Sequence, residues 1–86
     1  MPEISRFFGI VIVMYYADHG LPHFHAHYGS TWARVRLAPI ELLNGNLPPR
    51  ALRLVLEWAT LHESELVESW RLVRLKEPPL RIAPLE

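Results

Sequence analysis

The feature that most constrains the fold is a pair of short alternating runs joined by two small residues. The runs cover residues 23–28 and 31–37, and Gly29-Ser30 lies between them. A two-residue link of this kind is typical of a tight β-hairpin. The link also sets the register, so Tyr28 is expected to pair with Thr31 and His23 with Arg36.

This register divides the side chains between two faces, because successive side chains alternate across a strand. One set is mostly apolar and suits a core: Phe24, Ala26, Tyr28, Ala33 and Val35. The opposite set combines histidine, arginine and one tryptophan: His23, His25, His27, Trp32, Arg34 and Arg36. We expect this His/Arg face to be the functional surface.

The segments on either side of the hairpin predict one more strand and a helix. Residues 8–17 are apolar at nearly every position, which predicts a strand buried on both faces, and residues 18–22 form the loop after it. From Pro49 to about Lys76, apolar residues recur at steps of three and four. We expect one long helix here, with a break near Thr60 as the alternative, where Glu63 would complete a capping box.

These elements predict a single α+β domain over residues 1–86. Its small antiparallel sheet is a three-stranded meander with a short C-terminal edge strand at residues 80–84, and the long helix packs on one face. One helix covers one side of a sheet only. On the other side, Val11, Val13 and Tyr15 would form an apolar strip beside the His/Arg face. We therefore expect a homodimer or a protein partner on that side.

Composition narrows the function classes. The 86 residues carry nine basic and nine acidic side chains, a balance that argues against the broad positive field of a general nucleic-acid binder. The absence of cysteine fits a reducing cytoplasm. The apolar run at residues 7–17 is too short to cross a membrane and lacks the pattern of a signal peptide. We expect a cytoplasmic protein without a membrane partner.

The His/Arg face is open to two kinds of catalysis. Histidines at alternate positions of one strand can converge on zinc or another transition metal, and the metal set would be His19, His23 and His25. Asp18 is a further candidate ligand. Arginines directly opposite the histidines would repel a cation, so the primary expectation is a site without a cofactor.

The second kind is a metal-independent ribonuclease. In that hypothesis, Asp18 and His19 complete a catalytic group in which His23 and His25 act as general acid and base near neutral pH. Arg34 and Arg36 would hold the scissile phosphate, and Trp32 would stack on a base. The plainest alternative is a structural homodimer that uses the same polar residues without catalysis.

Four segments of the chain resemble domain-of-unknown-function family 4160, a group of small uncharacterised bacterial proteins. They are residues 4–10, Asp18-His19 with the string Pro22-His23-Phe24-His25-Ala26, residues 54–59 and residues 82–85. The resemblance extends over essentially the whole chain, and the Pro-His-Phe-His-Ala string is its most specific part. Members are suspected partners in toxin–antitoxin pairs, which implies a cytoplasmic protein with a small protein partner.

The resemblance also selects residues. It points to Arg6, Asp18, His19, His23 and His25, whereas His27 lies outside the family pattern. It implies a site built from Asp18 and the three selected histidines, with Arg6 or Arg34 as the anion holder.

Our leading hypothesis is a component of a toxin–antitoxin-like pair that binds a protein partner or RNA through the His/Arg face. A metal-binding or hydrolytic enzyme and a structural homodimer are the alternatives.

Overall fold

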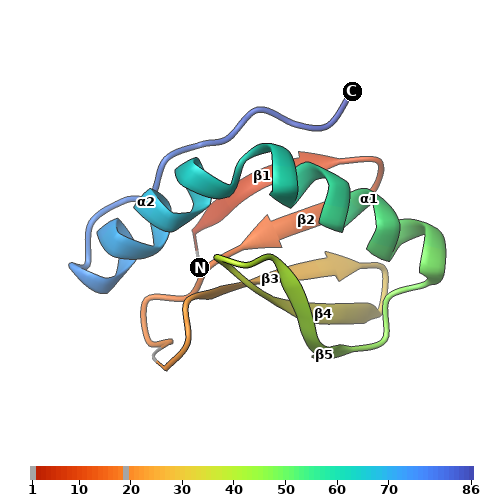
Figure 1. Cartoon of the computed structure of the whole chain (residues 1–86), viewed down its shortest axis with the longest axis horizontal. Coiled ribbons are helices and arrows are strands. Elements are labelled where there is room, and N and C mark those ends of the chain that lie inside the picture. Colours follow the sequence, from red (N-terminus) through yellow and green to blue (C-terminus); the bar gives the residue numbers. More distant parts are fainter. Residues whose placement is uncertain (1, 19) are drawn as a thin grey trace.

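The computed structural model describes residues 2–18 and 20–86, and this part of the chain forms one antiparallel sheet with two helices across one face (Figure 1). The sheet is a meander in which each strand pairs with its neighbour in the sequence. The predicted α+β class is confirmed. The elements are β1 (Glu3–Phe7), β2 (Ile10–Val13), β3 (His23–Tyr28), β4 (Thr31–Arg36), β5 (Glu41–Gly45), α1 (Pro49–Leu61) and α2 (Glu63–Arg74).

The predicted hairpin register is confirmed at every pair. β3 and β4 join through Gly29-Ser30, with Tyr28 opposite Thr31 and His23 opposite Arg36. The predicted division into faces also holds for the core side, where four side chains are fully buried: Phe24, Ala26, Ala33 and Val35. Tyr28 is the exception, because it ends the strand and is 40% exposed.

The prediction of a three-stranded meander was wrong at both edges of the sheet. At one edge, the run at residues 8–17 is not a single strand. Phe8 and Gly9 have φ values of +50° and +80°, which make a two-residue turn between β1 and β2. At the other edge, β5 extends from Glu41 to Gly45 and pairs with β4, where no strand was predicted. Positive φ at an aromatic residue such as Phe8 is uncommon. A turn was therefore not predicted within this apolar run.

The predicted C-terminal edge strand was also wrong. In the described part of the chain, residues 80–84 form no strand. The tail instead runs along β1, where the Ile82 amide donates a hydrogen bond to the Ile4 carbonyl at 3.0 Å. The Trp58 indole donates to the Ala83 carbonyl at 2.8 Å and holds the tail against α1. Pro84 has no amide hydrogen to extend a ladder.

The single long helix was wrong as well. α1 ends at Leu61 and α2 begins at Glu63, and the break falls at His62, whose φ and ψ are −119° and 26°. Thr60 does not start a new helix, because its hydroxyl donates to the Leu56 carbonyl inside α1 at 2.8 Å. The apolar stripe nevertheless continues across the break. Its buried members on both helices are Val55, Ala59, Leu66, Trp70 and Val73.

The core lies between this stripe and one face of the sheet, with Trp58 at its centre. The Trp58 side chain is fully buried, and its ring centroid lies 5.3 Å from that of Phe7 and 5.9 Å from that of Phe24. Within residues 2–18 and 20–86, neither helix has the length and apolar character needed to cross a membrane. Most of the His/Arg face lies on the side of the sheet away from the helices (Figure 1), but His23 at its end packs against Trp70 of α2, with ring centroids 5.2 Å apart.

A substitution at Gly45 tests the unexpected strand β5. Gly45 has a φ of +127°, and a Cβ there would overlap the Cα of Ala33 and the carbonyl oxygen of Trp32. We expect Gly45→Ala to lower the free energy of unfolding by about 3 kcal/mol, since backbone atoms of β4 would have to move. Urea denaturation followed by tryptophan fluorescence measures the loss.

Gly29→Ala is the matched control. Gly29 has a φ of +58°, but nothing lies within 4 Å of its Cβ position. This variant meets only the left-handed backbone cost of about 1 kcal/mol. Equal losses in the two variants would contradict the close approach of β5 to β4.

Candidate functional site

Asp18, His23 and His25 converge at one end of the sheet. Both histidines lie on the same face of β3, and Asp18 comes from the loop that joins β2 to β3. Asp18 Oδ2 lies 3.0 Å from His25 Nε2 and 3.2 Å from His23 Nε2. One ligand atom from each residue falls within 4.8 Å of the other two. The strand spacing predicted the two histidines together, and the loop supplies the carboxylate.

His23 is held in one orientation by the loop that precedes β3. Its Nδ1 lies 2.7 Å from the Leu21 carbonyl oxygen. A carbonyl oxygen can only accept, so Nδ1 carries the proton and Nε2 of the neutral ring presents a lone pair. His23 is only 4% exposed, and among the described residues its Nε2 has no hydrogen-bond partner. The approach to Asp18 is short but not aligned as a hydrogen bond.

His25 is partly buried and hydrogen-bonded to Asp18. Burial lowers the pKa of His25 below its usual value, and the hydrogen bond and negative charge of Asp18 offset only part of that effect. The neighbouring imidazoles of His23 and His27 lower the pKa further. His25 is therefore neutral at pH 7, which is the form that can accept a proton or bind a metal.

Tyr15 was not predicted as a site residue, yet it positions two histidines. Its ring packs against that of His25 in a T-shaped arrangement, with centroids 4.6 Å apart and ring planes at 82°. Its hydroxyl lies 3.2 Å from His27 Nε2. The alternation along residues 11–15 places Tyr15 on the His/Arg face and could have revealed this role.

The two other predicted histidines have different outcomes. His27 shares the face of β3, but its Nε2 is engaged with Tyr15 and it is not one of the three converging residues. His19, which was predicted as a catalytic residue and as a metal ligand, lies outside the described residues.

The three predicted arginines differ in their partners. Arg36 forms an ion pair with Glu41 at 2.6 Å, and Arg6 forms one with Glu3 at 2.8 Å. Arg34 instead donates through Nε to the Asn44 side-chain oxygen at 2.8 Å. The expected repulsion of a cation is therefore reduced at Arg36, because Glu41 balances its charge.

A shallow hollow of about 290 Å³ borders the cluster on the same face. Tyr15 and His27 line it together with Glu3, Arg6, Val11 and Val13. Arg6 thus lies in this hollow rather than in the Asp18 cluster. Val13 is fully buried and Val11 is partly buried, so the predicted apolar strip exposes less surface than its sequence suggested. Trp32, paired with His27 across the hairpin, is 39% exposed.

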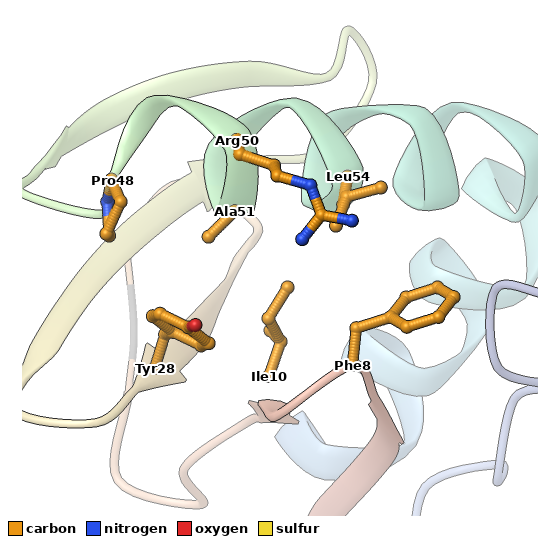
Figure 2. Close-up of a pocket in the computed structure, with 7 residues that line it drawn as sticks. All are labelled: Phe8, Ile10, Tyr28, Pro48, Arg50, Ala51 and Leu54. Carbon is orange, nitrogen blue, oxygen red and sulfur yellow. The ribbon is translucent and has the colours of Figure 1, made fainter.

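A second, smaller pocket of about 70 Å³ lies at the opposite end of β3, between the sheet and the start of α1 (Figure 2). Its lining contains no histidine and no carboxylate: Phe8, Ile10, Tyr28, Pro48, Arg50, Ala51 and Leu54. The pocket therefore lacks the proton-transfer and metal-binding groups that the Asp18 cluster brings together.

A family model for a domain of unknown function, DUF4160, matches residues 9–71. The chain belongs to the DUF4160 family. The matched residues of this DUF4160 protein include the Asp18 cluster and both arginines of β4, whereas Arg6 precedes them. No curated protein and no solved structure matches the chain. The family description assigns no activity to this DUF4160 domain.

The lowered pKa of His25 predicts the effect of Asp18→Asn. Asp18 raises this pKa against the larger effect of burial, so its removal should lower the pKa further. Titration of the imidazole proton signals by NMR measures the change, and Glu41→Gln is a control that should leave His25 unaffected. A higher pKa in Asp18→Asn would contradict the assigned contact.

The lowered pKa of His25 also makes the stability of the folded protein depend on pH. A histidine whose pKa is lowered in the folded state binds protons more readily when the chain is unfolded. The contribution of His25 to the free energy of unfolding is therefore lost as the pH falls below the ordinary histidine pKa. Urea denaturation between pH 7 and pH 5 measures this loss.

Proposed function

We propose that this DUF4160 protein binds a divalent transition metal ion of the zinc class through Asp18, His23 and His25, and that the site is hydrolytic. Three protein ligands leave a coordination position for water or substrate, as in catalytic zinc sites. Bound zinc lowers the pKa of its water and supplies a nucleophile near neutral pH. His25 is neutral at pH 7, and the proton that its Nε2 donates to Asp18 has to move to Nδ1 before Nε2 can bind a metal.

The buried Nε2 of His23 is the observation that carries this proposal. It presents a lone pair toward a carboxylate oxygen 3.2 Å away, and neither atom of a neutral imidazole and an ionised carboxylate can donate to the other. The Asp18 side chain is 28% exposed and its Oδ2 already pairs with His25, but the buried Nε2 of His23 has no donor among the described residues and faces a carboxylate, which is unfavourable unless a cation or proton lies between them. A metal ion satisfies both acceptors.

The spacing and the second contact of His23 also support a metal. With bonds of about 2.0–2.1 Å, the ligands of tetrahedral zinc lie about 3.3 Å apart. The observed separations of 3.0 and 3.2 Å from Asp18 are close to this value, and all three ligand atoms lie within 4.8 Å of one another. The Leu21 carbonyl accepts a hydrogen bond from Nδ1 of His23. Metal-binding histidines are usually oriented by such a bond from the nitrogen that does not bind the metal.

This ligand set modifies the one predicted from the sequence. Asp18 takes the place that was expected for His19, which lies outside the described residues. Two histidines and one carboxylate suit zinc, and the same set also suits iron(II). The metal must therefore be identified by elemental analysis of protein purified without an affinity tag.

Metal binding by single variants tests the proposal. We expect the wild type to bind one zinc per chain, and Asp18→Asn, His23→Gln and His25→Gln each to bind it at least about 100-fold more weakly, because even the loss of an outer-shell partner costs 10–100-fold. Isothermal titration calorimetry measures the affinities. Cobalt(II), added in place of zinc, reports the coordination by its visible absorption, and circular dichroism verifies folding.

His27→Gln is the matched control, since it removes a neighbouring imidazole of the same strand face. It should leave zinc affinity within about threefold of the wild type, a difference far smaller than the loss of a ligand. Failure of the folded wild type to bind zinc, cobalt(II) or iron(II) would overturn the proposal, as would an equal loss in His27→Gln.

A second candidate function is metal-free acid–base catalysis within a toxin–antitoxin-like pair. The 3.0 Å hydrogen bond between Asp18 and His25 favours it, because a carboxylate oriented on an imidazole is a common general-base arrangement. The exposed Trp32 and the uncovered part of the His/Arg face are compatible with an RNA or protein partner. This function does not depend on the lone pair of His23.

Growth after induced expression tests that role. If the protein is a toxin that acts through this site, expression of the wild type in bacteria should arrest growth, and His25→Ala at an equal protein level should relieve the arrest. Arrest by both chains would place the toxicity elsewhere. Normal growth with both would contradict a toxin role and leave the antitoxin role to be tested by partner capture.

A further inference from the structure

We propose that the Asp18–His23–His25 site accepts a nucleotide-sized phosphate ester, with the phosphate bound by Arg34 and the base stacked on Trp32. This inference deepens the proposed function and rests on it, because the phosphate is placed beside the three metal-binding side chains. Four of these residues are cross-strand partners or near neighbours on β3 and β4.

The position of Arg34 selects it as the anion-binding residue. It lies directly opposite His25 in the hairpin register, on the face that carries the cluster. Cross-strand neighbours have Cβ atoms about 4.5–5.5 Å apart, so the Arg34 side chain begins beside that of His25, and its Nε turns to Asn44 on the far side of β4. An anion that bridges the guanidinium and the imidazole would contact His25 and any cation bound to it.

The charge of Arg34 is available, unlike that of the other arginines on the face. Arg36 is neutralised by Glu41 and Arg6 by Glu3. Among the described residues Arg34 has no acidic partner, and Asn44 occupies only its Nε. The neutral amide fixes the guanidinium without cancelling its charge. The two terminal nitrogens are left for a bidentate contact, the geometry that suits phosphate oxygens.

Trp32 provides a surface for a base next to this anion site. It lies two residues before Arg34 on β4, which places it on the same face at roughly 6.8 Å along the strand. It is 39% exposed despite its size. Stacking of a base on such a ring is favourable for any base. The phosphate site and the stacking surface are thus separated by about the distance between the phosphate and the base of one nucleotide.

The pairing of the remaining arginines limits the size of the ligand. Binding of a long single-stranded nucleic acid requires a row of unpaired cations. The affinity of such binding falls steeply with salt concentration for each phosphate that is neutralised. On this face, the described residues offer one such cation, since ion pairs hold the two other arginines. The equal numbers of basic and acidic side chains add no long-range attraction. The site therefore suits a single phosphate with its adjacent base.

Ligand titrations of the zinc-loaded full chain test this inference. Adenosine monophosphate, inorganic phosphate and adenosine serve as probes, and calorimetry measures the dissociation constants. We expect adenosine monophosphate to bind more tightly than either of the other two. Arg34→Gln should weaken its binding by about 10- to 100-fold, the effect of losing charge-assisted hydrogen bonds. Trp32→Ala should weaken the binding of adenosine monophosphate but not the binding of inorganic phosphate.

Arg36→Gln is the matched control, because it removes the neighbouring arginine whose charge is already balanced by Glu41. It should change the affinity for adenosine monophosphate by less than about threefold, as expected for an exposed ion pair. Equal effects of Arg34→Gln and Arg36→Gln would overturn the inference. So would equal affinities for adenosine and adenosine monophosphate, or a much tighter fit for a long oligonucleotide.

Zinc affinity, measured first on the same variants, distinguishes failure of the proposed metal site from failure of the proposed nucleotide site. Arg34→Gln should bind zinc as the wild type does, since Arg34 is not a ligand. Normal zinc binding without Arg34-dependent nucleotide binding overturns the inference and leaves the metal site standing. Absence of zinc binding overturns the proposed function on which the inference depends.

Discussion

The alternation of side chains along β3 is the constraint on which the core and the candidate site both depend. Phe24 and Ala26 are fully buried against the helices, which forces His23 and His25 onto the opposite face. Burial of one Phe side chain is worth roughly 1.5–3 kcal/mol. A slip of one residue would expose this side chain and carry both histidines into the core, so the energy of the core also maintains the geometry of the cluster.

The candidate site combines rigid and irregular parts of the chain. The strand supplies two imidazoles at a fixed spacing, and the loop before it supplies the carboxylate of Asp18 and the carbonyl of Leu21. The carbonyl sets the tautomer of His23, and the ring of Tyr15 restricts His25. Such supporting contacts preorganise a site because they limit the rotamers of the reacting groups. Among the described residues, Nε2 of His23 is the one buried polar side-chain atom of the cluster that has no hydrogen-bond partner.

Local pairing determines which charges of this neutral chain can act on a ligand. Ion pairs with Glu41 and Glu3 balance Arg36 and Arg6, whereas the amide of Asn44 holds Arg34 without balancing it. The sequence shows the arginines but not these partners, because Glu41 and Asn44 meet β4 only through the pairing of β5. The face is therefore less basic than its composition suggested. Its capacity for an anion is concentrated beside His25.

The sequence by itself determined the hairpin register, the core face of β3 and the grouping of His23 with His25, because a two-residue turn and strand alternation are local rules. The apolar stripe also predicted the helical region, and the break at His62 lies two residues beyond Thr60, where the alternative prediction placed it. Only the tertiary structure decided that Phe8-Gly9 is a turn, that β5 joins the sheet and that Asp18 meets both histidines. Alternation and helical periodicity encode none of the three, because Phe8 adopts an uncommon positive φ, β5 packs Gly45 against the backbone of β4, and the Asp18 side chain turns from a loop toward β3.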